Sequence, residues 1–252
     1  MTSEPGAHEA TLEVYERSAQ SWAEQAHSRR DEALEFTRGL QVRDPTATAA
    51  VVDLGSGPGT HLGDLPAGTI ALDASAAMLA LVADSYPDTA AVRADLRSLP
   101  FARHSLRGAW ANKSYVHLAR PLVPMALWDL HRAILPGGLV SLGLFGGNQE
   151  HARFGGDHFA GRYFSLWPED LLEAVAEGAG FHTETLRTHR TSAADVPYLS
   201  VTLRRERTLA DTVGPGMRLL LVGLNPSLHA ADSGVGFSGR SNRGWPALLA
   251  SG

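Results

Sequence analysis

Residues 51–60, with the sequence VVDLGSGPGT, decide the fold class of this chain of 252 residues. Two β-branched residues lead into Asp53, and Gly55, Gly57 and Gly59 follow at alternate positions. The pattern predicts a buried strand that ends in a loop lying very close to a ligand, because glycine places no Cβ between the backbone and its neighbour. We expect a helix to begin after the loop and to point its free N–H groups into the same space.

The spacing of these glycines bears on the kind of ligand. A dinucleotide-binding loop follows the pattern G-x-G-x-x-G, but Thr60 stands where its third glycine would be, and Gly59 comes one residue early. Asp53, two residues before the first glycine, suits a cationic or amine-bearing ligand better than a pyrophosphate. An ordinary strand-to-helix turn without a ligand is the alternative interpretation.

Two more acidic residues stand at the ends of short predicted strands. Residues 69–73 end at Asp73, and residues 90–95 end at Asp95. In a doubly wound sheet, an acid at the end of the second strand reaches the ribose hydroxyls of an adenosine. Ser75 is placed to cap the helix expected next. The alternatives are that Asp73 is only a helix cap and that Asp95 is only a solvated turn residue.

The pattern D-x-G-x-G-x-G and the segment LDASAAML (residues 72–79) resemble the first two motifs of class I S-adenosylmethionine-dependent methyltransferases. The resemblance covers about residues 8–207. It implies an α/β fold with a doubly wound, mostly parallel, seven-stranded sheet of the Rossmann-like methyltransferase type, which binds its ligand at the carboxyl ends of the strands. It also implies S-adenosylmethionine as the cofactor. The cofactor-binding residues that it implies are Asp53, Gly55, Ser56, Gly57, Gly59, Asp73, Ala74, Met78, Asp95 and Leu96, with Asp95 accepting from the adenine amino group.

The rest of this region continues the alternation of strands and helices. Further strands are expected over residues 108–114, 139–145, 181–190 and 197–206, and helices over residues 121–135 and 167–180. A helical segment at the N-terminus is placed to lie over the cofactor.

The methyl acceptor and the catalytic residues stay open at this point. Transfer from a sulfonium needs an in-line nucleophile, and a protein base only when the acceptor carries a proton. Weak candidates follow the fourth predicted strand and a later loop: Asn112, Lys113, Ser114, Tyr115, His117, Arg162 and Tyr163. The fourth strand is not followed by an Asn/Asp-Pro-Pro-aromatic motif, and the chain has no cysteine. These features point to a small-molecule acceptor rather than to amino or carbon-5 methylation of a nucleic-acid base.

Composition narrows the remaining classes of function. The formal net charge is −5, which does not favour a nucleic-acid surface on the first region. The arginines at 204, 205 and 207 are interpreted as solvating a strand end. The histidines show no metal-ligand spacing, so no metal is predicted. The sequence shows no apolar run of membrane-spanning length and no signal-peptide pattern, and it fits a cytoplasmic location without a membrane partner. The oligomeric state is open.

The tail has a different character. The predicted organisation is a methyltransferase domain over residues 1–207, a linker over 208–215, and a short, incomplete α/β segment over 216–252. Within this segment, a predicted strand over 217–224, a Gly-x-Asn-Pro turn with Asn225, and the GVGF and SNRGWP runs resemble the start of a mismatch-specific uracil/thymine DNA glycosylase.

This second resemblance implies that Asn225 positions the water that attacks the sugar, and it makes DNA a possible partner. Gly244 stands where that family has an aromatic residue. The alternative functional interpretation is therefore a DNA-repair fusion in which the methyltransferase domain is accessory. A chance Leu-rich strand without glycosylase ancestry is the alternative interpretation of the tail.

Overall fold

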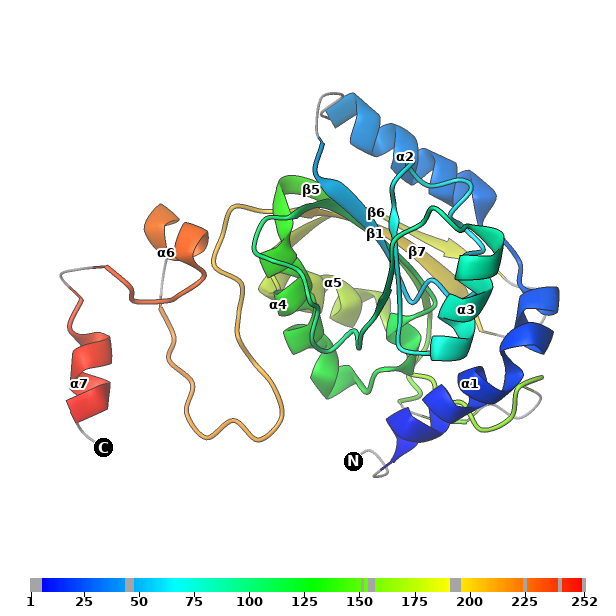
Figure 1. Ribbon diagram of the computed structural model, residues 1–252. Coiled ribbons are helices and arrows are strands. Elements are labelled where there is room, and N and C mark those ends of the chain that lie inside the picture. Colours follow the sequence, from blue (N-terminus) through cyan, green and yellow to red (C-terminus); the bar gives the residue numbers. More distant parts are fainter. Residues whose placement is uncertain are drawn as a thin grey trace.

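The computed structural model describes residues 6–43, 48–150, 152–153, 157–190, 196–223, 226–239 and 242–250. Within these ranges, seven strands form one sheet in the order β3-β2-β1-β4-β5-β7-β6 (Figure 1). Their bounds are β1 Ala50–Leu54, β2 Ile70–Asp73, β3 Ala91–Arg93, β4 Leu106–Asn112, β5 Ile134–Phe145, β6 Phe181–His189 and β7 Tyr198–Arg205. The neighbouring pairs among β1 to β5 are parallel, and β7 is antiparallel to both β5 and β6. The predicted doubly wound, mostly parallel α/β sheet is confirmed.

Helices cover both faces of the sheet (Figure 1). The α-helices are α1 Ala7–Gln25, α2 Arg30–Arg43, α3 Ala76–Ser85, α4 Val123–Ala133, α5 Glu169–Gly178, α6 Leu228–Ser233 and α7 Gly244–Ala250, with short 3-10 turns at Tyr115–His117 and Arg120–Leu122. α2 lies on one face, α4 and α5 lie on the other, and α1 crosses beside α3. No helix of the described ranges is long and apolar enough to cross a membrane.

Alternating strand positions supply the two apolar layers. Val51, Trp110 and Leu139, from three neighbouring strands, pack with Phe36 and Leu40 of α2. The adjacent strand positions belong to the larger core that also contains the buried faces of α4 and α5; they are Val52, Leu54, Ala109, Ala111, Val140 and Leu142. This period of two is what a sheet buried on both faces requires.

Gly108 of β4 allows α2 to lie close to the sheet. A Cβ at this position would stand 3.0 Å from Leu40 Cδ2 and 3.1 Å from both Phe36 Cζ and the Leu139 carbonyl oxygen. We therefore expect Gly108→Val to lower the free energy of unfolding by about 1–3 kcal/mol, because overpacking displaces neighbouring groups. Urea denaturation measures the change. Gly63→Ala is the control, since a Cβ there meets only the Tyr86 hydroxyl, at 3.6 Å; equal stability losses would contradict the packing role.

Three predicted elements differ from the structure, two of them before the tail. The helix expected after the glycine loop does not form: residues 58–64 make successive turns, with Gly59 N–H donating to the Ser56 carbonyl and Leu62 N–H to the Gly59 carbonyl. Positive φ values at Gly57 (+54°) and Gly59 (+85°) turn the chain away from the right-handed helix. The strand expected from residue 139 begins earlier, at Ile134, and carries a register shift opposite β4.

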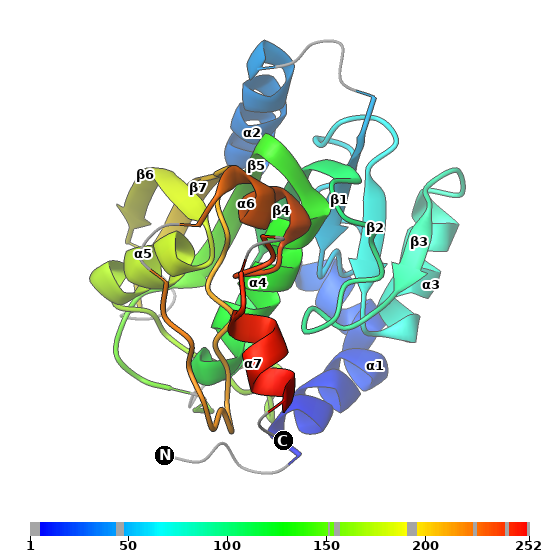
Figure 2. The same ribbon diagram turned by 90° about the vertical axis from the view of Figure 1, so that its left-hand side faces the viewer.

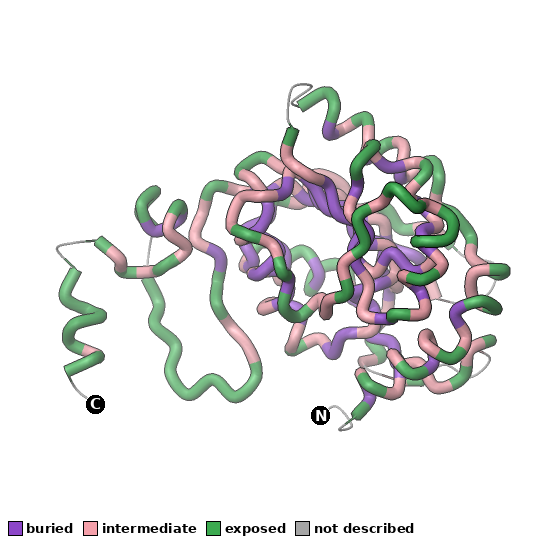
Figure 3. Tube along the Cα trace, in the orientation of Figure 1, coloured by how far each residue is buried: buried purple, intermediate pink, exposed green. Residues whose placement is uncertain are grey.

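The strand predicted over residues 217–224 does not form either. Residues 217–223 have no ladder partner, and their side chains are exposed, with Val222 81% and Leu219 65% accessible (Figure 3). An apolar run becomes a strand only where a neighbouring strand takes its backbone hydrogen bonds. Residue 224 and the predicted catalytic Asn225 lie outside the described residues.

The described part of the tail still contacts the first domain. Figure 2 shows α6 and α7 in front of the sheet's β5 side. Arg207 pairs with Asp232 at 2.8 Å, and Arg103 donates to the Asp232 carbonyl. The sequence interpretation of the arginine cluster is wrong for Arg205, which is buried and donates to the His131 carbonyl. Arg204 is partly exposed and Arg207 is exposed.

Candidate functional site

A cavity of about 730 Å³ opens at the carboxyl ends of the parallel strands. The chain runs from β1 outward to β3 and then returns to β4 on the other side of β1, so the strand order reverses at this place. Open α/β sheets bind ligands at such a reversal. The sequence-predicted residues that line the cavity are Gly55, Ser56, Gly57, Asp73, Ala74, Met78, Asp95, Leu96, Asn112, Lys113, Ser114, His117 and Arg162.

The glycine loop is held against β2 by its own backbone. The N–H groups of Gly55 and Ser56 both donate to the Leu72 carbonyl, at 2.7 and 3.0 Å. A Cβ at Gly55 would overlap the side chain of Ser114, whereas one at Gly57 would come into van der Waals contact with the Trp22 ring, at 3.4 Å. The loop therefore presents bare backbone to the cavity.

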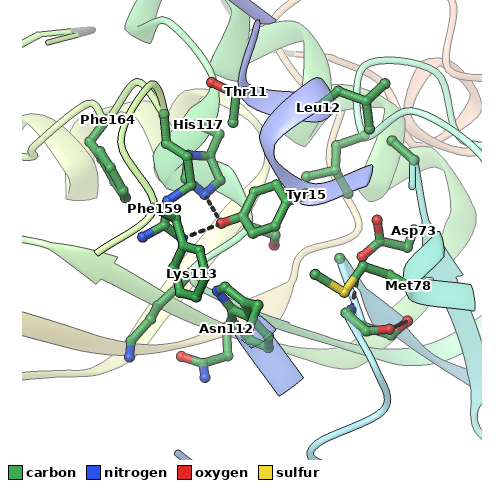
Figure 4. Close-up of a pocket in the computed structure, with 18 of the residues that line it drawn as sticks. Thr11, Leu12, Tyr15, Asp73, Met78, Asn112, Lys113, His117, Phe159 and Phe164 are labelled. Carbon is green, nitrogen blue, oxygen red and sulfur yellow. Dashed lines mark hydrogen bonds between the residues drawn. The ribbon is translucent and has the colours of Figure 1, made fainter. Parts of the chain in front are cut away.

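Asp73 links the loop to the start of α3. Its Oδ2 accepts from Gly57 N–H and its Oδ1 from Ser75 N–H, each at 2.8 Å. Burial raises the pKa of Asp73, although these backbone donors act in the opposite direction. Ser75 caps α3 as predicted, with its hydroxyl accepting from Met78 N–H. Figure 4 shows Asp73 and Met78 on the same side of the cavity.

Asp95 lies on the cavity wall but is already paired. The guanidinium of Arg97 donates to both carboxylate oxygens of Asp95, and the shortest of these contacts is 2.6 Å, to Oδ2. Nε2 of His8, in α1, lies 3.1 Å from the same oxygen. Arg97 N–H also donates to Oδ1, which is the turn contact of the alternative interpretation. Burial opposes ionisation, yet the hydrogen bonds from His8 and Arg97 hold the pKa of Asp95 well below its usual range. A contact with adenine stays a prediction.

Four of the predicted residues that the structure describes do not line the cavity: Asp53, Gly59, Tyr115 and Tyr163. Asp53 is only 1% exposed and its Oδ2 has no hydrogen-bond partner among the described residues. Burial, with a smaller contribution from Asp73, raises the pKa of Asp53 to about 8. Gly59 faces Leu62 and Tyr86 instead of the cavity. Tyr115 is buried in the core that α4 shares, where burial raises the pKa of its phenol.

A hydrogen-bonded chain that sequence reasoning missed crosses the other side of the cavity (Figure 4). Tyr163's carbonyl can only accept, so His117 Nδ1 carries the proton that is donated to it, at 2.8 Å. His117 Nε2 is then an acceptor for the Tyr15 hydroxyl at 2.7 Å, and Arg162 donates to the Tyr15 oxygen at 2.9 Å. Arg162 is in turn paired with Asp157.

The helical spacing of Thr11, Tyr15 and Trp22 in α1 is the sequence signal for this face, because all three line the cavity. The N-terminal helix therefore covers the site, as the sequence suggested. No spacing rule would have linked Tyr15 to a histidine 102 residues away.

We expect His117 to stay neutral over most of the acid range. Burial lowers its pKa to about 4, against about 6.5 for an exposed histidine. The unfolded chain takes up this proton first, so the contribution of His117 to stability is complete above pH 6.5 and is lost as the pH falls toward 4. Nitrogen NMR of the imidazole measures this directly.

The Tyr15→Phe variant tests whether the hydrogen bond from Tyr15 helps to keep the pKa of His117 low. It removes the donor that favours the neutral ring, and the pKa of His117 should rise. An imidazolium signal at pH 6 in the unaltered protein would contradict the assignment.

Comparison with known proteins agrees with this geometry. The family model described as "Methyltransferase domain" matches residues 51–138. The matched residues contain strands β1 to β4 of the sheet described above and helices α3 and α4. No curated protein matches the chain.

Solved structures match over most of the chain. The 1,6-didemethyltoxoflavin-N1-methyltransferase of Burkholderia thailandensis, bound to 1,6-didemethyltoxoflavin and S-adenosylhomocysteine, is 17% identical, covers 79% of this chain and 87% of its own, and has a TM-score of 0.58. The complex of DhpI with S-adenosylhomocysteine is 19% identical, with coverages of 80% and 98% and a TM-score of 0.57. CalS10, an amino pentose methyltransferase from Micromonospora echinaspora, is 19% identical, with coverages of 75% and 96% and a TM-score of 0.51. At these identities the structures share the fold.

The predicted enzyme class is confirmed: this is a methyltransferase, and the matched domain and fold agree with S-adenosylmethionine as its cofactor.

Proposed function

We propose that the protein transfers the methyl group of S-adenosylmethionine to a small organic acceptor. The observation that carries the proposal is one continuous cavity at the reversal of strand order. The glycine loop and Asp73 lie on one side of Tyr15, and His117, Phe159 and Phe164 lie on the other (Figure 4). The side with the glycine loop and Asp73 has the features of a nucleoside-binding site. The side with Phe159 and Phe164 has aromatic walls and space for a methyl acceptor.

The cofactor side is assigned residue by residue. The bare backbone from Gly55 to Gly57 suits the methionine part, Asp73 the ribose hydroxyls, and Asp95 with Leu96 the adenine. Gly59 and Asp53 act through the loop and not by direct contact, because neither lines the cavity.

The acceptor side contains Asn112, Lys113 and His117. Asn112 is held by the Tyr198 hydroxyl, which donates to its Oδ1 at 2.9 Å. Attack by the acceptor forms its bond to the methyl carbon while the sulfonium bond breaks and the thioether leaves. Where the acceptor carries a proton, Tyr15 can take it while passing its own proton to His117 Nε2. Cover by α1 excludes water and large substrates.

Calorimetry with S-adenosylhomocysteine tests the cofactor half of the proposal, and transfer of labelled methyl to a panel of small acceptors tests the other half. We expect binding by the unaltered protein and strongly reduced binding by Gly57→Val, because a branched side chain would fill the space beside Trp22. Equal binding of the cofactor product by the two proteins would overturn the proposal.

The division at residues 208–215 and the glycosylase-like interpretation of residues 216–252 also remain proposals. We expect no release of uracil from a mismatched duplex by this chain, because excision needs a flipped base held in an enclosed pocket. In the described part of the tail, residues 217–223 are exposed and enclose nothing. An oligonucleotide cleavage assay decides this: uracil release that disappears in Asn225→Ala would favour the DNA-repair alternative.

A further inference from the structure

Lys113 is the only lysine in a chain of 252 residues, and it lies in the cavity. It directly follows β4 and has a positive φ of 59°, a backbone conformation that a non-glycine residue rarely adopts. A left-handed residue at this point turns the chain out of the strand, and Figure 4 shows Lys113 on the same side of Tyr15 as His117 and Phe159.

The ammonium of Lys113 has no carboxylate partner among the described residues. Its Nζ lies 5.9 Å from the ring centre of Phe145 and 5.8 Å from that of Tyr198. Burial lowers its pKa, and the charges of Arg29 and Arg162 act in the same direction. A partly buried cation without an anion is an unfavourable arrangement unless a ligand completes it.

The neighbouring cations differ from Lys113 in this respect. Arg162 is paired with Asp157, and Arg29 lies 3.3 Å from Glu32 while its guanidinium stacks on the Tyr198 ring. The excess positive charge at this end of the cavity therefore belongs to Lys113.

The ammonium of Lys113 lies away from the side of the cavity that we assign to the cofactor. Phe145 ends β5 and Tyr198 begins β7, so the ammonium lies on the side of β4 that faces away from β1 and β2. Asp73 ends β2, and Figure 4 shows it and Lys113 on opposite sides of Tyr15. An anion paired with Lys113 is therefore expected to belong to the acceptor and not to the cofactor.

Aromatic rings enclose the same end of the cavity. Phe145, Phe159 and Phe164 all line it, and Phe145 packs against Phe164 with ring centres 6.1 Å apart. Flat apolar walls beside a single cation favour a flat apolar molecule with one negative group.

We propose that the methyl acceptor is a planar aromatic anion whose carboxylate or phenolate pairs with Lys113. The inference rests on the proposed methyl-transfer function and adds the class of acceptor to it. A cationic amine is disfavoured at this end because Lys113, which has no carboxylate partner among the described residues, would repel it.

The test uses protein saturated with S-adenosylhomocysteine and two matched probes, a naphthoate and the corresponding uncharged naphthamide. Calorimetry should show the naphthoate binding about tenfold or more tightly than the amide. Lys113→Met should remove this preference and leave the affinity for S-adenosylhomocysteine unchanged. Arg153→Met is the matched control, because it removes an exposed cation that does not line the cavity.

A second readout needs no variant. Lysine labelled with carbon-13 gives one lysine side-chain signal in this chain, and we expect its pKa to rise when the naphthoate binds. Equal or undetectable binding of the two probes, or an unmoved lysine signal, would overturn the inference. A loss of S-adenosylhomocysteine affinity in Lys113→Met would also overturn it, by placing the lysine on the cofactor. Failure of the unaltered protein to bind S-adenosylhomocysteine would instead overturn the proposed function itself.

Discussion

Asp73→Ala is expected to weaken binding of S-adenosylhomocysteine by about ten- to a hundredfold. The substitution removes a charge-assisted hydrogen bond to the ribose, a loss of about 1.5–3 kcal/mol, and each 1.4 kcal/mol corresponds to about a tenfold change in affinity. It also removes the acceptor for Gly57 N–H, which fixes the loop beside the cofactor. Calorimetry at constant pH and salt measures the change.

Ser75→Ala tests whether loss of stability at the start of α3 is enough to weaken binding. Ser75 is buried and does not line the cavity; its hydroxyl caps α3 and hydrogen-bonds Glu16 of α1. The substitution is expected to lower stability by about 1 kcal/mol and to leave the affinity nearly unchanged. If Ser75→Ala weakened binding as much as Asp73→Ala, the role of Asp73 would be structural. The exposed Asp88→Ala provides the baseline for loss of a carboxylate.

Local patterns were enough to predict the sheet. The β-branched residues before Asp53 and the apolar run after Gly138 indicate buried parallel strands, and the structure places strands at both. The acids at 73 and 95 follow β2 and β3 because a doubly wound sheet brings the ends of successive strands to one edge. The cofactor side depends on these local signals, and most of its predicted residues line the cavity.

The acceptor side and the cover formed by α1 depend on contacts between distant segments, which no local pattern contains. Tyr15 meets His117 across 102 residues, and Glu16 accepts from the first N–H groups of α3, at Ala76 and Ala77, from 60 residues away. Strand composition also led to a wrong prediction where the segment has no neighbouring strand to pair with. The apolar run after Gly216 has strand composition, but no neighbouring strand pairs with it in the described structure.

Asp53→Asn is expected to stabilise the protein, increasingly so as the pH rises. An ordinary aspartate has a pKa near 4, whereas burial raises that of Asp53 to about 8. Between these values the unfolded chain releases the proton and the folded chain keeps it, so stability falls as the pH rises and levels off above about 8. Asparagine has the shape of the protonated acid and removes this loss.

The gain from Asp53→Asn at pH 9 should be on the order of a few kcal/mol, since one pKa unit corresponds to about 1.4 kcal/mol. At pH 4 the two proteins should differ little. Thermal unfolding at both pH values measures the difference, and Asp88→Asn, at an exposed position, controls for loss of charge alone. A variant less stable than the parent at pH 9 would mean that a cation stabilises the charged form of Asp53 in the folded protein and that its pKa is not raised. Repeating the measurement with S-adenosylmethionine bound tests whether its positive charge supplies that cation through the glycine loop, because the stabilising effect of Asp53→Asn should then shrink.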